Sequence, residues 1–119
     1  MESTNTNNYP FSKLTLTKPM LDNLSKLGFE MMTPIQSEAL PHILKNLDVI
    51  AQAKTGSGKT AAFVWPMLVH CMAQSELKSG DGPIALICAP TRELCQQINA
   101  EVKRFGKCYN LQVRTLSFD

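Results

Sequence analysis

The stretch that decides the fold of this chain lies at residues 53–60 and reads Ala53-Lys54-Thr55-Gly56-Ser57-Gly58-Lys59-Thr60. It follows the pattern of a phosphate-binding loop, in which glycines allow positive φ and a close approach of the backbone to a ligand. The N–H groups of such a loop can surround a triphosphate, with support from the dipole of the following helix. The pattern predicts that Lys59 reaches the β and γ phosphates and that the Thr60 hydroxyl holds Mg²⁺. The alternative is a flexible Gly/Ser loop that only caps a helix.

The segments on either side of this loop favour the phosphate-binding interpretation, because such a loop joins a strand to a helix. Residues 48–52 form a short apolar run, which predicts the strand. Residues 61–73 are rich in Ala, Met, Leu and Val, which predicts a helix buried against a sheet.

The rest of the chain continues this alternation. Apolar residues at helical spacing predict two more helices, at 17–27 before Gly28 and from the cap Thr91 to Phe105. The N-cap Thr33, with Pro34 at the first helical position, predicts another helix over 34–44, which Asn46 ends. An apolar run predicts a second strand at 84–89, and moderate alternation of apolar and polar residues predicts a third at 111–118. From residue 48 onward strands and helices alternate, which predicts an α/β fold with a parallel sheet flanked by helices. Ligands bind beyond the carboxyl ends of such strands, where the glycine-rich loop lies.

Composition narrows the class of protein. A length of 119 residues, 44% of them hydrophobic, suits one domain or part of one. No apolar run approaches the roughly 20 residues of a membrane span, and no secretory signal opens the chain, so we expect a soluble intracellular protein, cytoplasmic or nuclear. Residues 1–10 begin with a polar, Asn-rich run, which predicts a disordered tail. A net charge of +2 is too small to argue for nucleic acid by itself.

The four cysteines and two histidines do not suggest a metal site. No C-x-x-C spacing is present, and the histidines are not grouped with the cysteines. A disulfide framework is equally unexpected beside an intracellular nucleotide loop, so we expect free thiols.

Three motifs at their proper distances resemble those of DEAD-box ATP-dependent RNA helicases, a family of superfamily 2. Phe11, Gly28-Phe29 and Thr33-Pro34-Ile35-Gln36 resemble the adenine-recognition element, here at residues 11–36. The loop at 53–60 resembles the first ATPase motif, and Ala89-Pro90-Thr91-Arg92-Glu93-Leu94 resembles the first RNA-contact motif. The resemblance implies that residues 11–119 are the amino-terminal part of the first RecA-like domain, a P-loop NTPase fold with an incomplete parallel sheet.

The resemblance also implies roles for individual residues. Gln36 would pair with the adenine edge and Phe11 would stack on the base, whereas the residues alone favour a helix cap for Gln36 and a core position for Phe11. Lys59 and Thr60 would serve catalysis, with ATP and Mg²⁺ as cofactors. The residues implied in nucleotide binding are Phe11, Phe29, Thr33, Gln36, Ala53, Thr55, Gly56, Ser57, Gly58, Lys59 and Thr60.

RNA is the partner that the resemblance implies. Pro90, Thr91 and Arg92 would contact the RNA backbone, which makes binding tolerant of sequence. Without the resemblance, Arg92 would be interpreted as one member of a surface ion pair.

Departures from the family pattern leave the activity of this chain open. Met32 stands where the family usually has Pro, and the sequence contains neither Asp-Glu-Ala-Asp, which orders Mg²⁺ and the attacking water, nor a Ser-Ala-Thr motif, nor a second RecA-like domain. The chain is therefore expected to be part of an RNA helicase that is inert alone or, alternatively, a non-catalytic fragment that binds adenine nucleotide or RNA. A third hypothesis is the lack of a stable fold, since the strands that flank residues 49–52 in RecA-like sheets come later in the sequence. A phosphate-loop kinase is a weaker fourth one.

Overall fold

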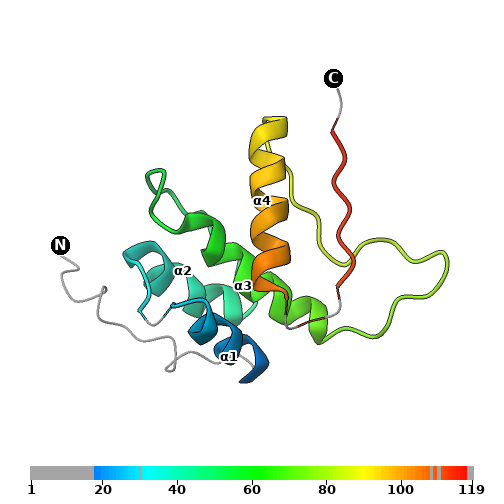
Figure 1. Ribbon diagram of the computed structural model, residues 1–119, viewed down its shortest axis with the longest axis horizontal. Coiled ribbons are helices and arrows are strands. Elements are labelled where there is room, and N and C mark those ends of the chain that lie inside the picture. Colours follow the sequence, from blue (N-terminus) through cyan, green and yellow to red (C-terminus); the bar gives the residue numbers. More distant parts are fainter. Residues whose placement is uncertain (1–17, 30, 108, 110, 118–119) are drawn as a thin grey trace.

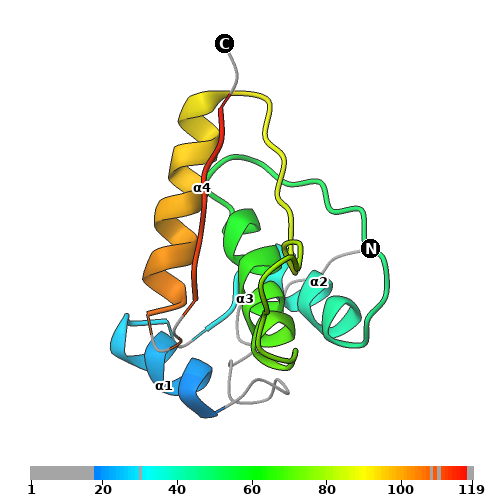
Figure 2. The same cartoon turned by 90° about the vertical axis from the view of Figure 1, so that its right-hand side faces the viewer.

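The computed structural model describes residues 18–29, 31–107, 109 and 111–117, so the expected tail and Phe11 lie outside the described residues. The helices within these ranges are α1 (Lys18–Lys26), α2 (Pro34–Leu44), α3 (Lys59–Met72) and α4 (Arg92–Phe105). In the views of Figures 1 and 2, α3 lies between α2 and α4 and packs against both, and α1 contacts α4. No helix within the described residues has the length and apolar character needed to span a bilayer.

The ends of α1 and α2 confirm the predicted stop residues. Gly28, with a φ of +88°, donates to the Ser25 carbonyl, and the next N–H, that of Phe29, donates to the Leu24 carbonyl. Asn46 has a φ of +64° at the end of α2 and makes the equivalent bond to Ile43. This pairing of a left-handed residue with two backward hydrogen bonds satisfies the carbonyls that a helix end leaves free.

The predicted beginnings of the helices also hold, with one shift. Thr33 is the N-cap of α2 and Pro34 is its first residue. Thr91 caps α4 through a 3.1 Å hydrogen bond from the Leu94 N–H to its Oγ1. Helix α3 begins two residues earlier than predicted, at Lys59, because Gly58 serves as its N-cap.

The core is formed by apolar faces of all four described helices. Three aromatic rings meet edge to face at its centre, with centroid distances of 5.3 Å between Trp65 and Phe105, 5.5 Å between Phe29 and Phe105, and 5.7 Å between Phe29 and Trp65. Around them lie the buried residues Met20, Leu24, Met32, Leu40, Ala61, Val64, Leu68, Ile98 and Val102. Burial of this apolar surface holds the helices together.

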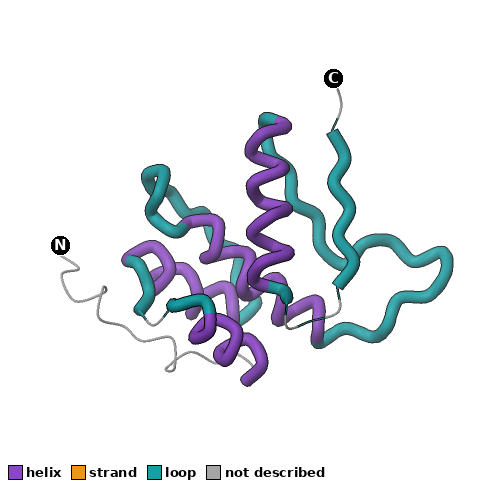
Figure 3. Tube along the Cα trace, viewed as in Figure 1, coloured by secondary structure: helices purple, strands orange, loops and turns teal. Residues whose placement is uncertain are grey.

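The predicted strands are the main correction. Within the described residues no segment forms a hydrogen-bonded strand, so the predictions at 48–52, at 84–89 and over the described part of 111–118 are wrong for this structure (Figure 3). The physical reason is that a strand exists only when its N–H and C=O groups pair with a neighbouring strand. Apolar composition indicates burial but does not supply that partner.

Two of these segments keep the side-chain alternation of a strand. Ile87 and Ala89 pack on the core while Leu86 and Cys88 are exposed, and partly buried residues likewise alternate with exposed ones over 111–114. Figures 1 and 2 show both segments running in the same direction alongside α4, which runs the opposite way. This arrangement of two parallel segments joined through a helix is that of a strand-helix-strand unit. Residues 48–52, by contrast, turn outward, and the Ile50 side chain is fully exposed.

A truncation at Ile50 tests this arrangement. Because its side chain contacts solvent, we expect Ile50→Ala to change the free energy of unfolding by less than about 0.5 kcal/mol. The control is Leu40→Ala, which removes a fully buried side chain from α2 and should cost about 2–5 kcal/mol. Urea denaturation followed by circular dichroism measures both. A cost for Ile50→Ala close to that of Leu40→Ala would show that residues 48–52 are buried in a sheet after all.

Candidate nucleotide-binding site

The phosphate loop has the backbone geometry that its sequence predicts. Gly56 and Gly58 adopt φ values of +83° and +85°, and the Ser57 N–H between them donates to the Lys54 carbonyl over 3.2 Å. Alternating left-handed glycines turn successive N–H groups toward one side, which forms a concavity for an anion. Helix α3 follows at once, and its first N–H groups have no intrahelical acceptor, so the positive end of its dipole faces the loop.

Lys59 closes the loop on itself. Its Nζ donates a 3.1 Å hydrogen bond to the carbonyl of Ala53, at the other end of the loop, and its side chain is exposed. The ammonium therefore already lies across the loop mouth, where a phosphate oxygen would replace a neutral carbonyl as its partner. That exchange would give the ammonium an anionic acceptor, and a hydrogen bond between two charged groups is stronger than the present bond to a neutral carbonyl.

Gln36 links the predicted adenine-recognition element to this loop. Its Oε1 accepts a 3.0 Å hydrogen bond from the Thr33 N–H, and its Nε2 donates a 3.1 Å hydrogen bond to the Gly58 carbonyl. The first contact confirms the capping role that the residues alone favour. The second was not predicted, and no local pattern reveals it, because the two residues are 22 positions apart and meet only when α2 packs against α3.

Two hydroxyl groups beside this junction are left without partners. Thr33 Oγ1 and Ser57 Oγ are buried, and neither has a hydrogen-bond partner within the described part of the chain. A buried hydroxyl without a partner is costly, and a polar ligand relieves that cost. Together with the glycine concavity and the Lys59 ammonium, these donors fit a phosphate chain. Thr60, the residue with the Mg²⁺-holding role in this pattern, is the second residue of α3 and is half-buried.

The other predicted nucleotide-binding residues differ in their surroundings. Ala53 and Thr55 belong to the loop itself. The ring of Phe29 packs edge to face against both Trp65 and Phe105, and the Arg104 guanidinium lies 5.4 Å from its centroid, so its side chain serves packing. Phe11 lies outside the described residues, and its stacking role stays a prediction.

The predicted RNA-contact residues lie at the start of α4 rather than at the phosphate loop. Pro90, Thr91 and Arg92 are exposed, and Thr91 uses its hydroxyl to cap the helix. A helix N-terminus with an exposed guanidinium is suited to an anionic backbone. The structure thus presents this motif on the surface, at the beginning of a different helix from the one that follows the phosphate loop.

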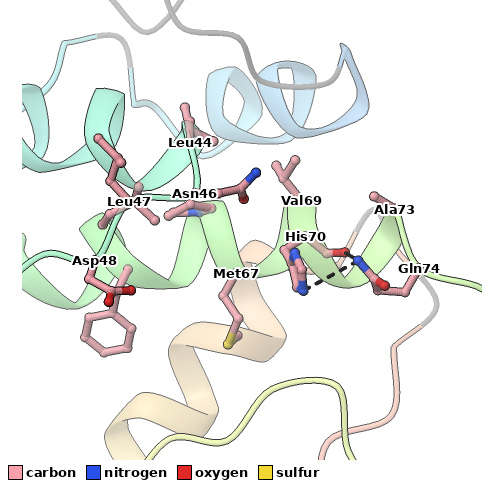
Figure 4. A pocket seen from close by; sticks show the side chains of 12 residues that line it. Leu44, Asn46, Leu47, Asp48, Met67, Val69, His70, Ala73 and Gln74 are labelled. Atoms are coloured by element: carbon pink, nitrogen blue, oxygen red, sulfur yellow. Dashed lines mark hydrogen bonds between the residues drawn. The ribbon is translucent and has the colours of Figure 1, made fainter.

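One shallow cavity among the described residues lies away from the predicted site. It encloses about 700 Å³ between the end of α2 and the outer face of α3, and Figure 4 shows Met67 and His70 at its wall, with Asp48 on the far side. His70 contacts Gln74, whose Nε2 also donates to the His70 carbonyl over 3.2 Å. A smaller cavity of about 290 Å³ includes Lys59 among otherwise apolar walls. Both adjoin residues 47–51, the segment that turns outward.

The Cys71 thiol on α3 is partly buried. Partial burial raises the pKa of Cys71, because desolvation disfavours the thiolate. Cys71, Cys88 and Cys95 are free thiols. A raised pKa makes the Cys71 thiol a poor nucleophile at neutral pH, so it offers no catalytic group to the nucleotide site.

The sequence of this chain is similar to sequences of known helicases. The family model for the DEAD/DEAH box helicase matches residues 33–118. The human ATP-dependent RNA helicase DDX42 is 55% identical over 102 residues, which is 86% of this chain but 11% of the relative. DEAD-box ATP-dependent RNA helicase 24 of Oryza sativa is 55% identical over 94 residues, which is 79% of this chain and 12% of that protein. The chain therefore spans about a tenth of the length of these relatives.

Solved structures agree with the sequence matches. The RNA-helicase Prp28 from Chaetomium thermophilum, crystallised bound to ADP, superposes with a TM-score of 0.75 at 42% identity over 87% of this chain and 26% of that one. A DEAD box protein from the hyperthermophile Methanococcus jannaschii superposes with a TM-score of 0.68 at 35% identity, over 81% of this chain and 25% of the other. These neighbours support a P-loop, RecA-like fold, although the described residues contain no sheet.

Proposed function

Since this chain belongs to the DEAD/DEAH box helicase family, we propose that it is the amino-terminal part of the first RecA-like domain of an ATP-dependent RNA helicase. Its own task is to bind an adenine nucleotide. In a longer protein this binding would serve RNA-stimulated hydrolysis of ATP and local separation or remodelling of RNA strands. The unit spans residues 11–119, with the adenine-recognition element at 11–36, the phosphate loop at 53–60 and the RNA-contact motif at 89–94.

The observation that carries this proposal is the hydrogen bond from Gln36 Nε2 to the Gly58 carbonyl. It joins the residue that would recognise the base to the loop that would hold the phosphates. A site for a plain phosphate has no need of such a link, whereas a site for a whole nucleotide must hold its base-recognition group at a fixed distance from its phosphate-binding loop. The link therefore favours an adenine nucleotide over a kinase substrate or a plain phosphate.

The chain's own groups divide the binding between them. The N–H groups around Gly56 and Gly58 donate to phosphate oxygens, and Lys59 neutralises the β and γ phosphates. The Ser57 hydroxyl, which has no hydrogen-bond partner within the described residues, gains one from the ligand. Thr60 would hold Mg²⁺ through its hydroxyl. When bound, ATP would supply the phosphoanhydride bond whose hydrolysis drives the helicase cycle, and Mg²⁺ would neutralise charge on its phosphates. The remaining residues proposed to contact the nucleotide are Phe11, Thr33, Gln36, Ala53 and Thr55. Phe29, the other residue of the predicted set, is proposed to support the site from the core, where its ring packs.

RNA is the second proposed partner. Thr91 and Arg92 lie where α4 begins, and their exposed backbone and guanidinium groups suit RNA phosphates. Contacts of this kind do not distinguish bases, so we expect binding that tolerates many sequences. Pro90 precedes the cap and belongs to the same surface.

For these 119 residues taken alone, we propose nucleotide binding without ATP hydrolysis as the alternative to helicase activity. The sequence contains no Asp-Glu-Ala-Asp, and phosphoryl transfer to water requires acidic groups that order Mg²⁺ and the attacking water. We therefore expect this chain to retain nucleotide without turning it over. Hydrolysis would be a property of a longer protein.

Calorimetric titration of the chain with Mg²⁺ and ATP tests the proposal. We expect submillimolar affinity, weakened about tenfold by Gln36→Ala because the amide contact with adenine is lost. Gln97→Ala, an exposed residue on α4, is the matched control and should leave the affinity unchanged. Equal affinities for ATP and GTP would contradict adenine recognition. RNA-stimulated phosphate release that Lys59→Ala abolishes would contradict the expectation of binding without turnover.

A further inference from the structure

The amide of Gln36 is held in one orientation by two backbone groups. The Thr33 N–H can only donate and the Gly58 carbonyl can only accept, so Oε1 must face Thr33 and Nε2 must face Gly58. The side chain is 2% exposed, so water does not compete for these bonds. Rotation of the amide by 180° would place Oε1 against the Gly58 carbonyl, two acceptors, and Nε2 against the Thr33 N–H, two donors. A buried site strongly disfavours both contacts.

Gly58 also provides the space that this arrangement needs. A Cβ built on Gly58 would overlap the Nε2 of Gln36 and would lie 3.0 Å from Thr33 Oγ1. Gly56 has almost the same backbone conformation, with φ +83° against +85°, but a Cβ there meets nothing within 4 Å. Both loop glycines thus have the positive φ that the loop requires. Of the two, only Gly58 must also lack a Cβ to leave room for the Gln36 side chain of α2.

We infer that Gly58 is a positioning residue for the choice of base: its carbonyl, and its lack of a Cβ, hold the Gln36 amide in the orientation that accepts adenine and rejects guanine. The inference rests on the proposed nucleotide site and adds a role in base selection to a glycine of the phosphate loop. It couples the part of the site that reads the base to the part that holds the phosphates.

The hydrogen-bonding capacity of the fixed amide matches one purine. Oε1 keeps one lone pair and Nε2 keeps one N–H. Adenine presents a donor at N6 and an acceptor at N7, which pair with these two groups, whereas guanine presents acceptors at both O6 and N7. An amide free to rotate could turn its Nε2 donor toward guanine O6, but the bonds to Thr33 and Gly58 oppose that rotation. The amide is buried, so a base reaches it only after the groups that cover it move. The two backbone groups that fix its orientation belong to the cap of α2 and to the phosphate loop.

The two alanine variants of the loop glycines test this role. Calorimetry of the wild-type chain with Mg²⁺ and either ADP or GDP should show a preference for ADP of about 5- to 150-fold, as expected of a bidentate contact. Gly56→Ala strains the loop, so it should weaken both nucleotides and keep their ratio. Gly58→Ala adds the same strain and also displaces the amide, so the ratio should fall to within about threefold of unity.

A second measurement follows the amide without any nucleotide. The side-chain NH₂ resonances of Gln36, identified by their loss in Gln36→Ala, should move strongly in Gly58→Ala and little in Gly56→Ala. This readout decides the matter even where Gly58→Ala binds both nucleotides too weakly for calorimetry, and dispersed amide spectra show that each variant is folded.

The remaining outcomes are distinct. Equal loss of the ADP preference in both variants, or an unmoved Gln36 resonance in Gly58→Ala, would overturn the role of Gly58 and leave the nucleotide site intact. A wild-type chain that binds ADP and GDP equally would overturn base selection. A wild-type chain that binds neither would overturn the proposed function itself.

Discussion

Lys59→Ala is expected to weaken the binding of Mg²⁺ and ADP on the order of a hundredfold. In the structure the ammonium spans the loop mouth through a single 3.1 Å hydrogen bond to the Ala53 carbonyl, ready to exchange that carbonyl for a phosphate. Removing one partner of a charged contact that ligand binding shields from water costs about 2–5 kcal/mol. Fluorescence or calorimetric titration with ADP measures the loss.

Lys54→Ala is the matched control, because it removes the same charge from an exposed position in the same loop. We expect its affinity for ADP to stay within about threefold of the wild-type value, since screened surface charges contribute little. The unfolding transition should not move in Lys59→Ala, because the side chain is exposed and its bond is peripheral. Comparable losses in the two variants would mean that general positive charge, and not the position of Lys59, attracts the nucleotide.

Trp65→Ala should have the largest effect on stability, with a cost of about 3–5 kcal/mol. The indole is fully buried in α3 and lies edge to face against both Phe29 and Phe105, so its loss leaves a cavity where α3 meets α4 and the segment after α1. A domain of this size has a net stability of about 5–15 kcal/mol, so this single change removes a large share of it. Thermal unfolding followed by circular dichroism is the measurement.

Two further variants make that result specific. Trp65→Phe keeps an aromatic ring in the cluster and should recover part of the loss. Leu86→Ala removes a side chain that is 80% exposed and should change stability by less than about 0.5 kcal/mol. A Trp65→Ala variant as stable as Leu86→Ala would contradict the packed helical arrangement. A wild-type chain that unfolds without a cooperative transition would contradict it too, and would support the hypothesis of an unfolded fragment.

The sequence by itself determined the four described helices and most of their ends. Gly28 and Asn46 end α1 and α2, Thr33 and Thr91 begin α2 and α4, and the glycines of the phosphate loop take the positive φ that their pattern predicts. These features rest on hydrogen bonds between residues five positions apart or fewer, so the local sequence contains all that they need. The motif residues of the phosphate loop were identifiable for the same reason.

Only the tertiary structure decided which groups meet across the chain. The bond from Gln36 to Gly58 spans 22 positions, and the bond from Asn23 to the Phe105 carbonyl spans 82. The predicted strands failed for the same reason. Residues 48–52 and 84–89 have apolar runs and residues 111–117 alternate, but the described residues supply no paired neighbour for any of them. A helix closes its hydrogen bonds within its own segment, whereas a strand, like a side chain that bridges two elements, depends on a partner that local sequence does not specify.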